Sequence, residues 1–139
     1  MKIRLLLLTL AFSILGVFAQ AHPVNGLLGY WQTEQPLYNN GVQFNLEYNF
    51  YQNQAELVVH CYFPDGAYLE SSAASYASYD YQQIYVHNTQ RRVSQDPYRF
   101  CEASIYAGTW YAQFDYYGRM ILTVPTPYNT QFVLVRNYR

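Results

Sequence analysis

Residues 42–63 read VQFNLEYNFYQNQAELVVHCYF, two runs of alternating side chains around a polar break at residues 52–54. Phe44 and Leu46 stand at every second position of the first run, and Leu57 and Val59 do so in the second. A period of two places such residues on one face of a β-strand, whereas a helix would need a period near 3.6. The stretch therefore predicts two antiparallel strands that share one apolar face.

The same period continues outward from this stretch, separated by turn signals such as Pro64-Asp65-Gly66. The chain holds 17 Tyr and 8 Phe, and aromatic residues favour strands. A meander of short strands removes its exposed edges by closing on itself. We therefore predict an all-β fold, an antiparallel meander closed into a small calycin-like up-and-down barrel of about eight strands, with an open sandwich or jelly roll as the alternative. The predicted strands are 28–34, 42–51, 55–63, 67–76, 81–88, 98–106, 109–116, 119–124 and 130–137.

The first 21 residues have the organisation of a secretory signal peptide. Lys2 and Arg4 precede an apolar run from Leu5 to Phe18, and Ala19-Gln20-Ala21 supplies the small residues of a cleavage site. The alternative is a membrane anchor, but a membrane span needs about 20 apolar residues and this run is shorter. We predict a signal peptide at 1–21, a single β-barrel domain at 22–139, and a periplasmic or secreted location.

Two cysteines, Cys61 and Cys101, lie in the predicted mature chain. An even number of cysteines in an exported protein predicts a disulfide bond, with two buried free thiols as the alternative. The predicted strands place both on apolar faces, Cys61 with Val59 and Cys101 with Ile105. We therefore expect the bond to join two strands through the interior.

The sequence Leu27-Leu28-Gly29-Tyr30-Trp31 resembles the Gly-x-Trp motif on the first strand of the lipocalin-like calycin barrels. In those families the Trp plugs one end of the barrel and an Arg of the last strand packs across its ring. The resemblance assigns these barrel-closing roles to Trp31 and Arg136. It also implies that the barrel encloses a small hydrophobic ligand, a fatty acid or similar lipid. The apolar residues expected to line that cavity are Phe44, Leu46, Leu57, Val59, Ile105, Phe114, Leu122 and Leu134.

The resemblance also suggests a second function, inhibition of a secreted metalloprotease or lysozyme. Calycin-type inhibitors carry a short N-terminal arm before a Leu-x-Gly-x-Trp stretch, and residues 22–26 would form that arm. Their disulfide closes a shorter loop near the start of the chain than Cys61–Cys101 would. The ligand-binding hypothesis therefore ranks first, and a secreted hydrolase is the alternative partner.

No catalytic motif is present in the sequence, so we predict that the protein is not an enzyme and needs no cofactor. An N-terminal His22 would be able to chelate copper with His60 or His87, but Pro23 follows it and no second ligand motif is visible, so no metal site is predicted. Outside the signal peptide the acidic residues outnumber the basic ones, which argues against nucleic acid as a partner. The oligomeric state is not predicted.

The tyrosines leave three interpretations open. They would line a cavity if they point inward, form an interaction surface if they point outward, or simply fill a strand-rich fold.

Overall fold

The computed structural model describes residues 26–125 and 129–139. The predicted signal peptide, His22 and the part of the arm before Gly26 lie outside the described residues. No described segment is a helix of the length and apolar character that crossing a membrane requires.

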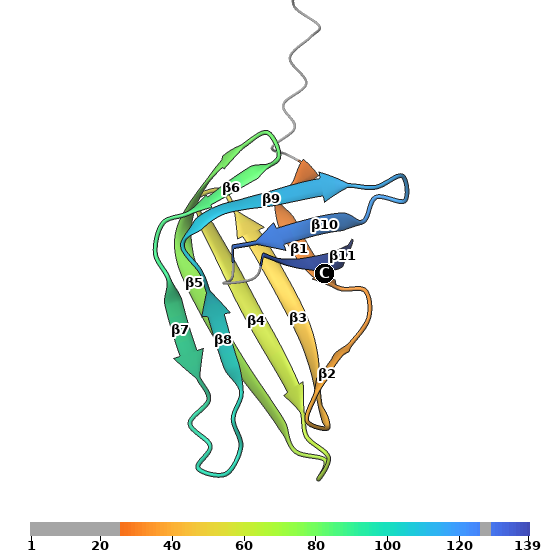
Figure 1. Cartoon of the computed structure of the whole chain (residues 1–139), viewed down its shortest axis with the longest axis vertical. Helices are drawn as coiled ribbons and strands as arrows, with labels where there is room; N and C mark the ends of the chain where they lie inside the picture. Colours follow the sequence, from red (N-terminus) through yellow and green to blue (C-terminus); the bar gives the residue numbers. More distant parts are fainter. Residues whose placement is uncertain (1–25, 126–128) are drawn as a thin grey trace, which may run out of the picture.

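The described chain is built of β-strands that pair antiparallel (Figure 1). The strands are β1 (Gly29–Thr33), β2 (Leu37–Asn39), β3 (Val42–Tyr51), β4 (Gln54–Tyr62), β5 (Tyr68–Asp80), β6 (Gln83–Val86), β7 (Gln90–Val93), β8 (Glu102–Ile105), β9 (Gly108–Phe114), β10 (Met120–Val124) and β11 (Thr130–Arg136).

Eight of these strands form a closed antiparallel barrel in the order β1-β3-β4-β5-β6-β9-β10-β11. The ring closes because β1 pairs with β11 on one side and with β3 on the other. Neighbours in space are largely neighbours in sequence, as in a meander, and the short strand β2 extends the sheet beside β3. The predicted fold class is therefore confirmed.

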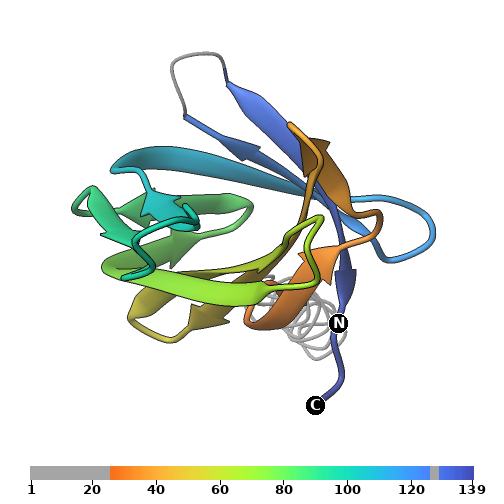
Figure 2. The ribbon, with the colours of Figure 1, turned by 90° about the horizontal axis from the view of Figure 1, so that it is seen from below.

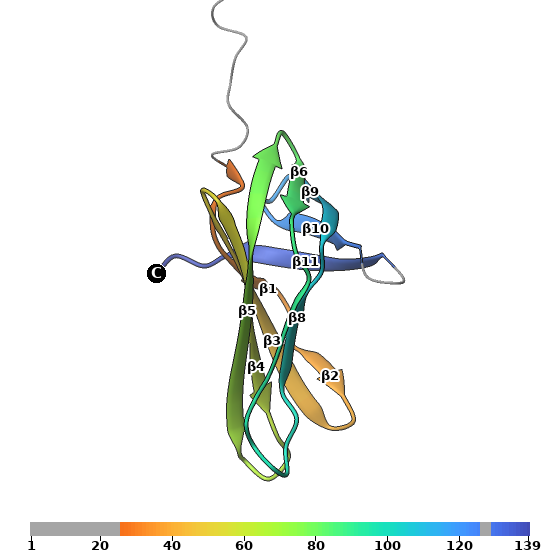
Figure 3. The ribbon, with the colours of Figure 1, turned by 90° about the vertical axis from the view of Figure 1, so that its left-hand side faces the viewer.

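The hairpin of β7 and β8 is inserted between barrel strands β6 and β9 and forms a separate two-stranded sheet. It packs against β4 and β5, so that this half of the molecule has two layers (Figure 3). Ala103 and Ile105 of β8 are fully buried in this contact. The predicted disulfide is present between Cys61 of β4 and Cys101 before β8, with a Cα–Cα distance of 6.0 Å. It fastens the hairpin to the inner face of the barrel wall.

The interior of the barrel holds a cluster of aromatic side chains centred on Tyr48. The Tyr48 ring lies 6.0 Å from Trp110 and 5.7 Å from Phe132, measured between ring centroids. Met120 and Leu122 fill the space beside them and are fully buried. The alternating pattern therefore identifies the inward face of β3, β4 and β10 correctly.

The predicted strands differ from the observed ones mainly around the inserted hairpin. The predicted strand 81–88 ends at Val86, and β7 was not predicted because all four of its residues are exposed and have no apolar alternation. The predicted strand 98–106 is ordered as a strand only over β8. By contrast, β5 runs on to Asp80, since Ala77 and Tyr79 continue its inward face beyond the predicted end.

Candidate functional site

One end of the barrel remains partly unfilled and forms a pocket of about 300 Å³, which we call the mouth pocket. Strands β3, β10 and β11 and the β7–β8 hairpin lie around this end (Figure 2). The pocket has one wall of apolar side chains and another that carries polar groups. Its lining residues are Leu37, Phe44, Leu46, Tyr48, Leu57, Val59, Glu102, Ser104, Tyr106, Val124 and Phe132.

The apolar wall comes from the inward faces of β3 and β4. Their antiparallel register places Leu46 opposite Val59 and Tyr48 opposite Leu57, so these four side chains form one continuous surface. Such cross-strand neighbours stand within contact distance on the same face of a sheet. The wall is suited to an apolar ligand because contact with it removes apolar surface from water.

The polar wall comes from β8, in which alternate residues face in opposite directions. Ala103 and Ile105 are buried, whereas Glu102, Ser104 and Tyr106 line the pocket. The Arg91 guanidinium binds the Glu102 carboxylate through Nε at 2.8 Å and Nη2 at 2.9 Å. This hydrogen bonding holds the pKa of Glu102 below its usual range, so the carboxylate is ionised at neutral pH.

Tyr48 lies at the base of the mouth pocket and brings a hydroxyl group into a mostly apolar environment. Only 3% of the residue is exposed, and burial raises the pKa of the phenol far above its ordinary value of 10.0. Its hydroxyl makes no hydrogen bond to any residue of the described chain. A tyrosine in the lining of an apolar pocket combines apolar surface with a hydroxyl group that can bind a polar group.

The structure brings together only some of the residues expected to line one cavity. Phe44, Leu46, Leu57 and Val59 line the mouth pocket. The other four lie elsewhere: Ile105, Leu122 and Leu134 are fully buried in the core, and Phe114 is 40% exposed at the opposite end of the barrel.

That opposite end, which we call the closed end, is formed around Trp31. The guanidinium carbon of Arg136 lies 4.2 Å from the centre of the Trp31 ring, within the range of a cation–π interaction. Arg136 also donates hydrogen bonds to the backbone oxygens of Leu28 at 2.5 Å and Gly26 at 2.7 Å. These contacts join the first strand to the last and place Trp31 and Arg136 together as the resemblance implied.

The closed end also gives a physical reason for the glycine of the Gly-x-Trp sequence. Gly29 has a φ of +124°, and a Cβ atom there would collide with the Arg136 guanidinium. Trp31 is 2% exposed, and its indole nitrogen donates to the Leu27 backbone oxygen at 2.9 Å. A pocket of about 300 Å³ beside Trp31 and Phe114 is therefore bordered by an arginine that already donates to two backbone oxygens.

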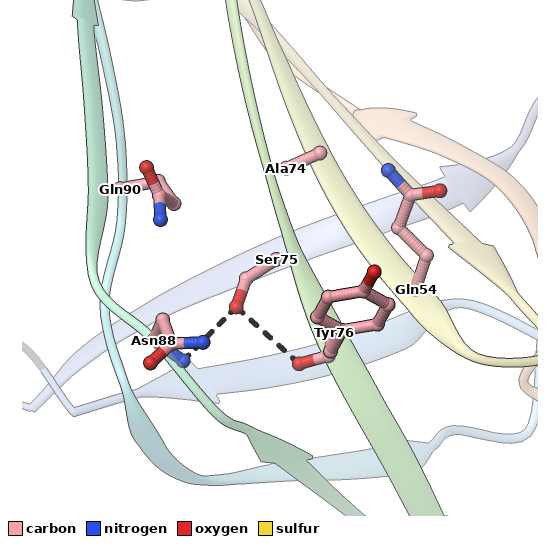
Figure 4. A pocket seen from close by; sticks show the side chains of 6 residues that line it. All are labelled: Gln54, Ala74, Ser75, Tyr76, Asn88 and Gln90. Carbon is pink, nitrogen blue, oxygen red and sulfur yellow. Dashed lines mark hydrogen bonds between the residues drawn. The ribbon is translucent and has the colours of Figure 1, made fainter.

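A third hollow, of about 320 Å³, lies beside β5 where the inserted hairpin begins (Figure 4). Its lining residues are Gln54, Ala74, Ser75, Tyr76, Asn88 and Gln90. The Ser75 hydroxyl accepts a hydrogen bond from the Asn88 backbone at 3.0 Å and donates one to the Tyr76 carbonyl at 3.3 Å. These bonds tie β5 to the start of the inserted hairpin, which explains the hollow as a structural junction.

Titratable side chains gather on the outer face of β3, β4 and β5. His60 lies 3.3 Å from the buried Glu47 carboxylate and 2.7 Å from the Tyr68 hydroxyl. Arg139 forms an ion pair with the same Glu47. Among the described residues no group of His, Cys, Asp and Glu is arranged to hold a metal ion, and the cluster is a network of ion pairs and hydrogen bonds around Glu47.

The tyrosines divide between the interpretations that the sequence left open. Tyr48 and Tyr106 line the mouth pocket, and Tyr79 donates to the Gln54 backbone oxygen at 2.8 Å. Many others lie on the surface, including Tyr116 and Tyr117 in the turn after β9. The exposed ones do not contribute to the mouth pocket.

Several pocket residues were not identified from the sequence, above all Glu102 and Ser104. The alternation of strand residues correctly places Glu102 and Ser104 on the face of β8 that is opposite to Ala103 and Ile105. In a strand of the barrel wall, however, that face would point toward solvent. Here β8 is an inner layer rather than part of the barrel wall, so the face away from the core faces the mouth. Only the position of the hairpin reveals this.

Comparison with known proteins gives no further assignment. No protein-family model, curated protein or solved structure matches this chain.

Proposed function

We propose that this protein binds a small apolar molecule in the mouth pocket. The observation that carries the proposal is a pocket of about 300 Å³ with a continuous apolar wall and a Tyr48 hydroxyl that pairs with no other described residue. Ligand sites typically combine apolar surface with a few polar groups that orient the ligand. The size of the pocket limits the ligand to a small molecule or a short chain.

The proposed ligand lies at the barrel end and not along the whole barrel axis. Trp31, Trp110 and Leu134 fill the remaining interior, so a long fatty acid has no path through it. The lipocalin-like resemblance of the Gly-x-Trp sequence supports ligand binding, because barrels of about eight strands are large enough to hold one small ligand. The proposed ligand therefore needs to occupy only the mouth pocket.

The proposed site of action is outside the cytosol. The Cys61–Cys101 disulfide fits an oxidising extracytoplasmic compartment. The signal-peptide pattern at residues 1–21 supports the same location. We propose a periplasmic or secreted binding protein on these grounds.

Titration with N-phenyl-1-naphthylamine, an uncharged apolar dye whose fluorescence rises on leaving water, tests this function. We expect saturable binding to the wild-type protein, weakened at least about tenfold by Leu46→Trp, which fills the pocket. Val133→Trp is the matched control, because Val133 is exposed on β11 and lines none of the three pockets described above. Lack of saturable binding, or equal binding by the Leu46→Trp protein, would contradict the proposal.

A further inference from the structure

The polar side chains of the mouth pocket carry one carboxylate and three hydroxyl groups. Glu102 provides an ionised carboxylate, and Ser104, Tyr48 and Tyr106 provide hydroxyl groups. No lysine or arginine is among the described residues that line the pocket. A carboxylate ligand would therefore find no cation in the lining to pair with.

Glu102 is held in place by Arg91 and Ser104, which are cross-strand neighbours on the same face of the hairpin, and does not depend on a ligand. Arg91 binds both carboxylate oxygens, and the Ser104 hydroxyl donates to one of them. The Arg91 side chain is 61% exposed and points from β7 to its neighbour β8, outside the set of lining residues. Each carboxylate oxygen has more than one acceptor site, so Glu102 retains acceptor capacity toward the pocket.

The Arg91–Glu102 pair is also electrically balanced. Because one positive and one negative charge cancel, the pair offers little net attraction to a cationic ligand, while the carboxylate oxygens still accept hydrogen bonds. The Tyr48 hydroxyl, which pairs with no other residue of the described chain, adds a second polar group beside the apolar wall. The arrangement matches a neutral ligand that donates a hydrogen bond.

We infer that the mouth pocket selects an uncharged apolar molecule bearing a hydroxyl group, and discriminates against a carboxylate of the same length. This inference rests on the proposed function and names the ligand class of the same site. An alcohol donates to Glu102 or Tyr48 without placing a second negative charge in the pocket. A carboxylate would lose its hydration and meet the Glu102 oxygens, which are acceptors with no proton to share.

Displacement of bound N-phenyl-1-naphthylamine by 1-octanol and by octanoate at neutral pH tests this selectivity. The two competitors have the same chain length and differ at the head group. We expect 1-octanol to displace the dye at a concentration at least about tenfold lower than octanoate, which corresponds to roughly 1.4 kcal/mol.

The Glu102→Gln variant sharpens the test, because it removes the charge and keeps a side chain of similar size. We expect octanoate to compete at least about threefold better with this variant than with the wild-type protein, because the glutamine amide can donate a hydrogen bond to the ligand carboxylate and Arg91 is left without its counter-charge. Glu70→Gln is the matched control: it removes one carboxylate from the outer face of β5, away from the pocket, and should leave the ratio unchanged.

The outcomes separate the two proposals. If the dye does not bind and neither competitor is bound, the proposed function fails. If the dye binds and octanoate displaces it as well as 1-octanol does in the wild-type protein, the ligand-class inference is overturned while the binding function stands. The wild-type comparison decides this without relying on the stability of any variant.

Discussion

At the closed end, Trp31 and Arg136 fasten the first strand to the last and border a pocket of about 300 Å³, whereas at the mouth a pocket of the same size lies against the continuous apolar wall of β3 and β4. Both ends use the same alternating pattern. The difference arises from what covers each end: a plugging indole at one, and at the other a separate hairpin that covers the opening incompletely. A strand pattern alone therefore fixes which side chains point inward but not whether they meet other side chains there.

The largest effect is expected at the closed end. Trp31→Ala should destabilise the protein by about 5 kcal/mol, because it removes a fully buried indole and leaves Arg136 and the Leu27 oxygen without their partner. Chemical denaturation followed by circular dichroism measures this change. A loss below about 2 kcal/mol would mean that Trp31 does not anchor the closed end.

Removal of the disulfide should cause the next largest loss of stability. The bond attaches the hairpin that lines the mouth pocket to β4. Cys61→Ala with Cys101→Ala removes a cross-link between residues 40 positions apart, which the chain-entropy model values at about 4 kcal/mol. Denaturant unfolding of the double variant provides the measurement, with the wild-type protein under reducing conditions as a parallel case. If the double variant were as stable as the oxidised wild type, the hairpin would not need its covalent attachment.

A pair of leucines compares the two regions directly. Leu134→Ala should destabilise the protein by about 3 kcal/mol, because Leu134 is fully buried and its removal leaves a cavity. Leu46→Ala should have a smaller effect, about 1 kcal/mol, because Leu46 is half-buried and already borders an open space. Thermal unfolding of both variants measures the difference, and equal losses would show that the mouth is packed as tightly as the core.

The smallest effect concerns the tip of the inserted hairpin. The Arg99 guanidinium hydrogen-bonds Asp65 and lowers the pKa of that carboxyl below its ordinary value of 3.8. A lowered pKa in the folded state means that this stabilisation is complete at neutral pH and disappears as the pH falls below 3.8. Because the pair is exposed, we expect only a small decrease in Tm for Asp65→Asn at neutral pH.

The pH dependence provides the check on that pair. The difference in Tm between Asp65→Asn and the wild-type protein should shrink toward zero at acidic pH, when the wild-type carboxyl is protonated. A difference that persists unchanged in acid would assign the effect to something other than the ion pair.

The sequence predicts the barrel well because local alternation and turn residues determine β3, β4 and their neighbours. It also predicts the disulfide, since only two cysteines are present and both lie on apolar faces. The Trp31–Arg136 contact was accessible only through the resemblance of the Gly-x-Trp sequence. Local alternation was sufficient to predict the strands that have one buried face.

Only some of the residues that line the mouth pocket could be predicted from the sequence. Leu46 and Leu134 follow the same alternation, and only long-range packing leaves one at a pocket and the other in the core. Glu102 was missed because the β7–β8 hairpin lies inside the barrel wall, which no local pattern reports. Glu47 lies on the outer face of β3, and its burial there depends on pairs with Arg139 and His60 that are distant in the sequence.

A titration of the ¹⁵N-labelled protein with 1-octanol, followed by ¹H–¹⁵N NMR, tests the central claim most directly, since it reports on both ends at once. The account predicts saturable chemical-shift changes at the backbone amides of Phe44, Leu46 and Ser104, with little change around Trp31 and Arg136. No saturable change, or changes centred on the closed end, would contradict it.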